Sequence, residues 1–336
     1  NIVFSPIHGT GISVIPALKA YGFTNVNVVE EQMVIDGNFP TVVYPNPEEE
    51  DALSMAMTKA KEIDAELVMA TDPDADRVGI AVKDNKGEWL LFNGNMTGTL
   101  IINYMLTAWK EAGKLTGNEY IVKTIVTSYL IDRIATSYGV ECFNTLTGFK
   151  YIGELITSLE SYGYLIGEHV RDKDAVVSAV IIAEMAAYYK DQGSSLFEAL
   201  LDMYVEHGFF REKLISVTKK GKEGAEEIQQ MMADFRANPP KMLGGSPVTV
   251  LKDYQTQTVH YQDSGNTEST NLPTSNVLQF ITEDGSIVSA RPSGTEPKIK
   301  FYCSVNGELN SREEYPVQAE KLDKKITVLL KDLGVG

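Results

Sequence analysis

The chain has little cysteine and no long hydrophobic run. Its two cysteines, Cys142 and Cys303, are far apart and neither belongs to a CxxC pair, which argues against a disulfide framework and predicts a reducing compartment. No apolar run approaches the ~20 residues of a membrane-spanning helix, and no segment has the pattern of a signal peptide. We therefore expect a cytoplasmic protein without a membrane partner.

The chain is also short of positive charge. It carries 30 Lys and Arg against 46 Asp and Glu, a formal net charge of -16. Such an excess of negative charge argues against nucleic acid or an anionic membrane as a partner. A phosphate-bearing ligand would have to be bound by local cationic loops. The sequence does not indicate an oligomeric state.

The length of 336 residues and 43% hydrophobic content allow several cores. The chain opens on Asn1-Ile2-Val3-Phe4-Ser5, which reads as a buried strand entered midway, so we expect a piece of a longer protein. Strand and helix patterns alternate over residues 1–93 and again over 94–210, which predicts two consecutive α/β layers. Residues 211–336 predict an α+β domain with a small antiparallel sheet.

The C-terminal domain carries its own signals. Strands are expected at 247–253, 277–282, 287–290 and 299–305, with a hairpin turn at Glu283-Asp284-Gly285. The polar stretch 255–276 is interpreted as either a surface excursion or a functional loop. A closing helix is expected to turn one apolar face to the core, formed by Val317, Leu322, Ile326, Leu329 and Leu333.

The most informative stretch is Asp72-Pro73-Asp74-Ala75-Asp76-Arg77, between two apolar runs that predict buried strands. Three carboxylates at alternate positions on a tight loop would repel one another unless a hard divalent cation held them. A calcium-binding EF-hand would need Gly and Glu where Arg77 and Lys83 stand. A dehalogenase-type phosphatase with an aspartyl nucleophile and Mg²⁺ stays open, as does a solvated acidic turn. Arg77 favours a phosphate beside the metal.

Three further segments have features of anion sites. Thr147-Gly148-Phe149-Lys150 predicts a strand-to-helix turn that offers backbone N–H groups and one cation. Arg171-Asp172-Lys173-Asp174 can be explained locally as a helix start with Asp caps. Arg291-Pro292-Ser293-Gly294-Thr295-Glu296-Pro297-Lys298-Ile299-Lys300 combines an Arg, hydroxyls, a Gly and lysines, which predicts a nest for a phosphate. His8, in a Gly-rich turn, is either a phosphate contact or structural.

Taken together, these segments resemble the α-D-phosphohexomutase family of phosphoglucomutases and phosphomannomutases. The matching motifs stand in the family's order over essentially the whole chain: Ser-Pro-Ile-His-Gly-Thr-Gly (5–11), Asp-Pro-Asp-Ala-Asp-Arg (72–77), Gly-Phe-Lys-Tyr-Ile (148–152), Glu-Ser-Tyr-Gly-Tyr (160–164), Val-Arg-Asp-Lys-Asp-Ala (170–175) and Arg-Pro-Ser-Gly-Thr-Glu-Pro-Lys (291–298). Family members have four domains around a cleft, and the resemblance implies the second (1–93), third (94–210) and fourth (211–336).

The resemblance also implies roles for individual residues. Asp72, Asp74 and Asp76 would bind Mg²⁺ and Arg77 would lie beside the transferring phosphoryl group. The remaining substrate contacts implied are Glu160 and Ser161 with sugar hydroxyls, Lys150, Arg171 and Lys173 on the sugar-phosphate face, and Arg291, Ser293, Gly294, Thr295 and Lys300 with the non-reacting phosphate. The family's phosphorylated serine lies in a Ser-His-Asn-Pro loop that these 336 residues do not contain, so no catalytic nucleophile is expected in this chain.

The implied activity is a Mg²⁺-dependent interconversion of hexose 1-phosphate and hexose 6-phosphate, with glucose as the expected hexose, through a phosphoserine and a bisphosphate intermediate. This chain alone is expected to be inactive. Phosphomannomutase and phosphopentomutase activity remain alternatives within the family. The interval between Lys150 and Glu160 is shorter than the resemblance leads us to expect, which suggests that residues are missing there. A phosphatase of the dehalogenase type and a non-catalytic sugar-phosphate-binding protein are the rival classes.

Overall fold

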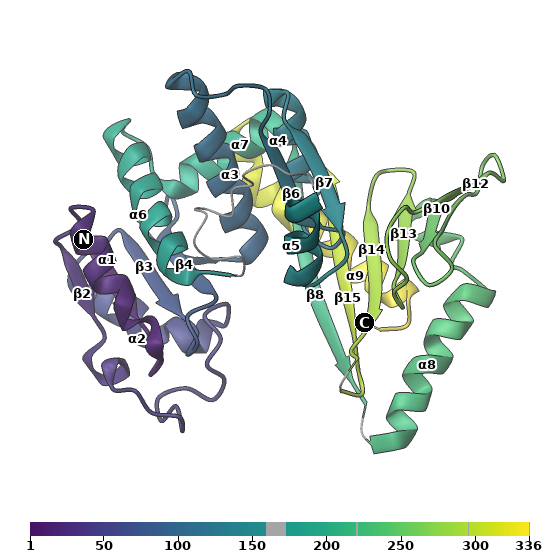
Figure 1. Ribbon diagram of the computed structural model, residues 1–336, viewed down its shortest axis with the longest axis horizontal. Helices are drawn as coiled ribbons and strands as arrows, with labels where there is room; N and C mark the ends of the chain where they lie inside the picture. The colour runs from purple at the N-terminus through teal and green to yellow at the C-terminus, as the bar shows by residue number, and fades with distance from the viewer. Residues whose placement is uncertain (159–172, 220, 295, 336) are drawn as a thin grey trace. The chain divides into compact units, whose positions relative to one another are not determined.

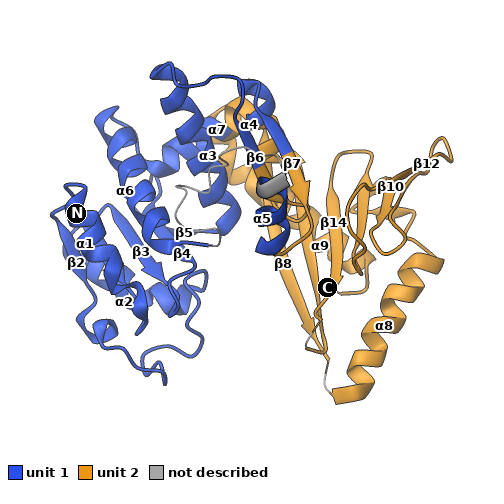
Figure 2. Cartoon of the chain, in the orientation of Figure 1, with its two compact units in different colours: residues 1–121, 134–142, 149–203 blue, residues 122–133, 143–148, 204–336 orange. Residues whose placement is uncertain are grey.

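The computed structural model describes residues 1–158, 173–219, 221–294 and 296–335 (Figure 1). The chain forms two compact units (Figure 2). The first contains residues 1–121, 134–142 and 149–203, and the second contains 122–133, 143–148 and 204–336. Within the described ranges, no helix is both long enough and apolar enough to span a membrane.

The first unit is built on a five-stranded sheet in the order β2-β1-β3-β4-β5. Its strands are β1 (Ile2–Ser5), β2 (Val26–Val28), β3 (Leu67–Thr71), β4 (Val78–Lys83) and β5 (Trp89–Phe92). β1 is parallel to β2 and β3, whereas β4 and β5 continue as antiparallel neighbours. β1 and β3 are buried along their whole length, as expected for strands with helices on both faces. Parallel pairing brings the carboxyl ends of β1 and β3 to one edge, where the acidic loop begins.

Helices cover both faces of this sheet. α2 (Glu50–Glu62) packs on β1 and β3, where Val3, Val68 and Ala81 join its buried alanines in one core. α6 (Ala175–Asp191) contacts β3 and β4 and also packs against α1 (Val14–Ala20). The remaining helical elements of the first unit are η1 (Thr10–Ser13), η2 (Glu30–Met33), α3 (Gly94–Glu111) and α5 (Phe149–Ser158).

Each boundary between these two sets of residues at 121/122, 133/134, 142/143 and 203/204 falls inside a helix or strand. These elements are β6 (Tyr120–Thr124), α4 (Leu130–Tyr138), β7 (Glu141–Thr145) and α7 (Leu196–His207). β6 and β7 form a separate two-stranded sheet.

The second unit is an antiparallel sheet in the order β12-β11-β10-β13-β14-β15-β8, with β9 paired to β10. Its strands are β8 (Phe209–Thr218), β9 (Met242–Leu243), β10 (Ser246–Asp253), β11 (Thr258–Tyr261), β12 (Thr267–Ser269), β13 (Leu278–Thr282), β14 (Ile287–Pro292) and β15 (Lys298–Gly307). α8 (Gly221–Ala237), η3 (Arg312–Glu314) and α9 (Tyr315–Asp332) complete the unit. Every second residue of β15 from Ile299 to Val305 is buried, and the ring of Phe235 on α8 packs edge-on against Phe280 and Phe301.

Three expectations for this unit were incomplete or wrong. The polar stretch 255–276 contains β11 and β12, whose hairpin is largely exposed and therefore lacks the apolar alternation of a strand with one buried face. β8 was not expected, because only its first two residues are fully buried. Val317 is 69% exposed and lies outside the buried face of α9, whereas Leu322, Ile326, Leu329 and Leu333 are buried.

Glu212, on β8, gives a prediction about pH. The hydroxyl of Ser128 donates a hydrogen bond to its carboxylate. Burial raises the pKa of Glu212 from 4.5 to about 7, against smaller opposing effects of Ser128 and Arg211. The folded protein therefore holds this proton more tightly than the unfolded chain, and stability is lost as the pH rises through about 7. Glu212→Gln is expected to raise the free energy of unfolding by about 1–3 kcal/mol at pH 8 and by much less at pH 5.

Urea denaturation at the two pH values measures this difference. The matched control is Glu226→Gln, which makes the same change at an exposed position of α8. An increase of equal size at both pH values would show that the ionisation of Glu212 is not its cause.

Candidate metal and phosphate site

The acidic loop connects β3 to β4 and is closed by its own backbone. The amide of Asp72 donates to the carbonyl of Arg77 at 3.3 Å, and the amide of Ala75 donates to the carbonyl of Asp72 at 3.0 Å. Ala75 has a φ of 57°, a left-handed conformation that is uncommon for a residue with a Cβ. The loop is therefore a tight turn that turns its carboxylates toward one another.

The three carboxylates meet as the sequence predicts. Ligand oxygens of Asp72, Asp74 and Asp76 all lie within 4.8 Å of one another. Asp72 is buried, Asp76 is partly buried and Asp74 is exposed, so the cluster opens toward solvent on one side. Clustered carboxylate oxygens are the donors that Mg²⁺ and Ca²⁺ prefer, and this donor set fits a hard divalent cation.

Asp72 also organises the loop from inside. Its Oδ1 accepts hydrogen bonds from the amides of Asp76 at 3.0 Å and Arg77 at 2.9 Å, and its Oδ2 accepts from Arg77 Nε at 2.6 Å. Burial raises the pKa of Asp72, although the hydrogen bonds and charge of Arg77 oppose the shift. An aspartyl nucleophile needs an oxygen free to attack phosphorus, so this arrangement does not favour Asp72 as the nucleophile of a dehalogenase-type phosphatase.

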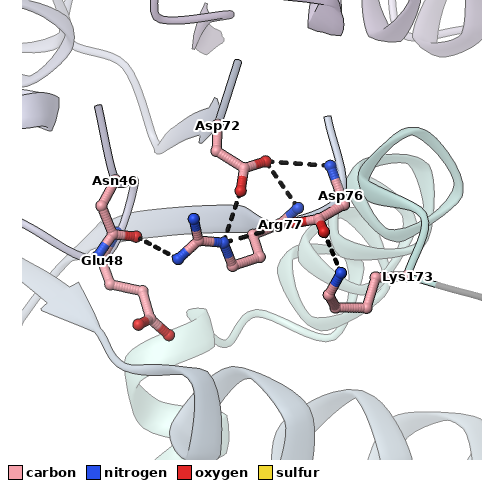
Figure 3. Close-up of polar contacts among 6 residues, drawn as sticks. All are labelled: Asn46, Glu48, Asp72, Asp76, Arg77 and Lys173. Carbon is pink, nitrogen blue, oxygen red and sulfur yellow. Dashed lines mark hydrogen bonds and ion pairs between the residues drawn. The ribbon is translucent and has the colours of Figure 1, made fainter. Parts of the chain in front are cut away.

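Two cations face the carboxylates (Figure 3). Arg77 Nε lies 3.5 Å from Asp76 in addition to its contact with Asp72, and Lys173 Nζ forms an ion pair with Asp76. Burial of Asp76 would raise its pKa, but the hydrogen bonds from Lys173 and Asp72 and the charges of Lys173 and Arg77 lower it. The carboxylates that could hold a metal and the cations that could hold an anion are therefore close together. A site in which a metal and an anionic ligand bind side by side needs both kinds of group.

The start of α6 is attached to the acidic loop. The amide of Ala175 donates to the carbonyl of Ala75 at 3.1 Å, and Asp174 caps α6 by accepting from the amides of Val176 and Val177. The local interpretation of this segment as a capped helix start is correct for Asp174. It does not extend to Lys173, whose ion-pair partner lies 97 residues away in the sequence.

The start of α5 lies near Lys173. The ring of Phe149 has its centroid 6.0 Å from Lys173 Nζ, and Lys150 Nζ lies 4.6 Å from the ring centroid of Tyr151. α5 begins at Phe149, so the predicted strand-to-helix turn is present.

A second cationic surface belongs to the second unit. β14 and β15 form a hairpin in which Arg291 is directly opposite Lys300, so both side chains are on one face of the sheet. Both are partly buried, and Gly294 in the connecting loop is exposed. The amide of Ser293 donates to the carbonyl of Lys298 at 2.7 Å and its Oγ accepts from the amide of Glu296 at 3.3 Å, which fixes the loop base.

Four predicted site residues lie outside the described residues: Glu160, Ser161, Arg171 and Thr295. The short interval between Lys150 and Glu160 ends in the same undescribed segment. His8 is buried, with Nδ1 2.8 Å from the carbonyl of Val34 and Nε2 2.8 Å from Thr41 Oγ1. Because both ring nitrogens have protein partners, His8 is structural rather than a phosphate contact.

Comparison with protein families accounts for this combination of sites. Residues 1–87 match phosphoglucomutase/phosphomannomutase alpha/beta/alpha domain II, 93–204 match alpha/beta/alpha domain III, and 215–308 match the C-terminal domain. The chain belongs to the phosphoglucomutase/phosphomannomutase family. The resemblance drawn from the motifs is thereby confirmed, as is the mixed fold of two α/β layers followed by an α+β domain.

Individual relatives of this family agree. The phosphoglucomutase of Staphylococcus haemolyticus is 36% identical over 318 residues, and that of Staphylococcus aureus (strain MSSA476) is 38% identical over 317. Both alignments cover 91% of this chain, but only 57% and 56% of the relatives. The chain thus spans a little over half the length of the curated relatives it matches.

Solved structures of the family share the fold. The pp63/parafusin phosphoglucomutase of Paramecium superposes with a TM-score of 0.65 at 17% identity, covering 99% of this chain and 57% of that one. A phosphoglucomutase/phosphomannomutase family protein of Burkholderia thailandensis gives 0.60 at 16% identity, covering 100% and 61%. An Aspergillus fumigatus N-acetylphosphoglucosamine mutase, solved with GlcNAc-6P and magnesium, gives 0.51 at 14% identity, covering 97% and 65%.

Sequence reasoning missed two residues beside Arg77 in this phosphoglucomutase/phosphomannomutase chain. Asn46 Oδ1 accepts a hydrogen bond from Arg77 Nη1 at 3.1 Å, and the charge of Glu48 acts on the same guanidinium (Figure 3). Both stand in the segment Pro45-Asn46-Pro47-Glu48, which the sequence presents only as the end of a Pro-rich loop. The sequence offered one indication, two polar residues next to prolines. Nothing in the neighbouring sequence predicts that they lie beside Arg77.

Proposed function

We propose that this chain forms the metal-binding and phosphate-binding part of a Mg²⁺-dependent phosphohexomutase, which interconverts hexose 1-phosphate and hexose 6-phosphate with glucose as the expected hexose. The observation that carries the proposal is the convergence of three carboxylates with Arg77 and Lys173 in one unit. Two cations beside a carboxylate cluster suit a phosphoryl group held next to a metal.

Roles follow from the positions of the side chains. Asp72, Asp74 and Asp76 would hold Mg²⁺, which supplies neutralisation of the charge on a phosphoryl group in transfer. The magnesium complex of the Aspergillus fumigatus relative supports this choice of metal. Arg77, whose side chain is 44% exposed, would position the phosphoryl group with the guanidinium N–H groups not bonded to Asp72 or Asn46. Lys150, Lys173 and, in the undescribed segment, Arg171 would bind the sugar phosphate, and Glu160 and Ser161 the sugar hydroxyls.

The hairpin of β14 and β15 would bind the substrate's other phosphate through Arg291, Ser293, Gly294, Thr295 and Lys300. A bisphosphate intermediate that turns end over end presents a phosphate at each end, so the reaction requires a second phosphate site away from the metal. Local cationic residues on this hairpin would allow a chain with a net negative charge to bind an anionic sugar phosphate.

The proposal concerns the complete gene product. We retain the division into family domains at 1–93, 94–210 and 211–336. The phosphoserine that the family reaction uses is not among the motifs of these 336 residues, and the chain by itself is expected to complete no turnover. Cytoplasmic location and the absence of nucleic acid and membrane partners remain predictions.

The direct test is conversion of glucose 1-phosphate to glucose 6-phosphate by the complete gene product, with Mg²⁺ and a trace of glucose 1,6-bisphosphate. Activity that requires both additions supports the mutase. Mannose 1-phosphate and ribose 1-phosphate in parallel assays distinguish the alternatives within the family. Release of inorganic phosphate without isomerisation would favour a phosphatase, and sugar-phosphate binding without either reaction would favour a binding protein.

Replacing Arg291 tests the second phosphate site. Arg291→Ala is expected to weaken binding of glucose 1-phosphate and glucose 6-phosphate alike, by about 1.5–3 kcal/mol, which is typical for a hydrogen bond to a charged group. Isothermal titration calorimetry measures the loss. The matched control is Arg312→Ala, at η3 of the same unit, which should leave both affinities unchanged. Unchanged affinity in Arg291→Ala would exclude Arg291 from the phosphate site.

A further inference from the structure

The guanidinium of Arg77 is held at two different nitrogens. Nε contacts Asp72 at 2.6 Å, and Nη1 contacts Asn46 at 3.1 Å. The Arg77 side chain is 44% exposed, so a single contact at Nε would leave its outer nitrogens free to turn in solvent. The second contact fixes the plane of the fork (Figure 3). A guanidinium must be oriented to bind phosphate through two parallel hydrogen bonds.

Asn46 is itself rigid. It is 7% exposed and stands between Pro45 and Pro47, whose rings restrict the backbone on both sides. Its amide donates to the carbonyl of Tyr44 at 2.8 Å, its carbonyl accepts from the amide of Glu49 at 3.0 Å, and its Oδ1 also accepts from the amide of Glu48 at 3.3 Å. An acceptor held this firmly can fix the more flexible arginine.

The Asn46 segment is also attached to the strand that follows Arg77. A Cβ on Gly79 of β4 would lie 1.9 Å from the carbonyl oxygen of Pro47, so the two backbones pass in direct contact because Gly79 has no side chain. Gly79 is two residues after Arg77. The acceptor and the arginine are therefore both anchored next to β4: the Asn46 segment through the contact of Pro47 with Gly79, and Arg77 as the residue immediately before the strand.

The chemistry of an amide suits this position. Asp72 and Asp76 place two carboxylates beside Arg77, and the charge of Glu48 acts on it as well. A further carboxylate at position 46 would supply the same acceptor oxygen but would add to the repulsion of an incoming phosphate. An amide oxygen orients the guanidinium without adding negative charge.

We infer that Asn46 is a positioning residue for Arg77 and fixes the guanidinium for the phosphoryl group. This inference rests on the proposed function. Asn46→Ala is expected to lower kcat about 10-fold with a smaller change in KM, because a misplaced phosphoryl contact costs most in the transition state. Asn46→Asp keeps the acceptor oxygen, so it is expected to retain most of kcat while raising KM for the sugar phosphate.

The experiment measures kcat and KM of the complete gene product with glucose 1-phosphate for these variants and for two more. Asn46→Ser keeps an acceptor for the amide of Glu48 but is too short to reach Arg77, and it should behave like Asn46→Ala even if the alanine variant folds poorly. Asn38→Ala is the control. Among the described residues, the exposed side chain of Asn38 forms a hydrogen bond only with Asp36. This variant should match the wild type.

Combination with Arg77→Ala separates positioning from a general structural role. In that background Asn46→Ser should cause no further loss of kcat, since the residue it orients is gone. An undiminished loss, or wild-type kcat in Asn46→Ser and Asn46→Ala, would overturn the inference. An inactive wild-type protein would instead count against the proposed function, and the two failures are thereby distinguished.

Discussion

Asp74→Asn is expected to lower the proposed mutase activity of the complete gene product by about 100- to 1000-fold, because a bound metal contributes several kcal/mol of charge stabilisation to phosphoryl transfer. The same substitution should weaken Mg²⁺ binding, since it removes the charge of one of three carboxylates that meet within 4.8 Å. Asp74 is the best of the three positions for this test, because its replacement should change metal binding without disturbing the loop. Its side chain is exposed, whereas Asp72 accepts hydrogen bonds that hold the loop itself.

Calorimetric titration with Mg²⁺ and the glucose 1-phosphate assay, both on the complete gene product, measure the two effects. Asp263→Asn is the matched control, because it makes the same change at an exposed position of the second unit. A high Mg²⁺ concentration should restore part of the activity of Asp74→Asn. If that variant bound Mg²⁺ as tightly as the wild type, the acidic loop would not be the metal site.

The acidic loop could be predicted because its determinants are local. β3 and β4 are short apolar runs of strand length, and the residues between them combine a proline with carboxylates that no buried strand would tolerate unpaired. The hairpin that contains Arg291 could be predicted for the same reason, since Gly285 marks one turn of its sheet and the Pro-Ser-Gly sequence marks the next. In both cases the few residues that form the turn also carry the charged and hydroxyl groups on which the site prediction rests.

The long-range partners of Arg77 and Asp76 could not be predicted in this way. Asn46 is 31 residues from Arg77, and Lys173 is 97 residues from Asp76. Each pairing depends on where the ends of other elements arrive once the sheet has formed. β8 was missed for a related reason, because an edge strand with few buried side chains has no clear periodic pattern.

The position of the acidic loop also depends on Gly9, a residue without a side chain, in the turn after β1. Thr10 donates to the carbonyl of Pro73 through its amide at 2.8 Å and through Oγ1 at 3.0 Å, which holds the loop against the turn after β1. Gly9 lies at this contact. A Cβ at Gly9 would be 2.2 Å from Pro73 Cα and 2.4 Å from its carbonyl oxygen, and backbone atoms cannot yield as the end of a side chain can.

Gly9→Ala is therefore expected to displace the acidic loop. Gly9 has φ -108° and ψ -165°, which alanine adopts without strain, so the whole effect should come from the collision with Pro73. We expect a loss of about 3 kcal/mol in the free energy of unfolding. We also expect Mg²⁺ affinity to fall about 10- to 100-fold, as it does when groups that orient metal ligands are changed. Urea denaturation and calorimetric titration with Mg²⁺ measure the two quantities.

The control is Gly37→Ala, in the same unit, where a Cβ would meet no atom within 4 Å and φ is not left-handed. It should change neither stability nor Mg²⁺ affinity appreciably. A loss of stability in Gly9→Ala with unchanged Mg²⁺ affinity would mean that the carboxylates keep their arrangement when Pro73 moves. The shape of the site would then be set within the loop, by the hydrogen bonds to Asp72, and the contact with the turn after β1 would serve folding alone.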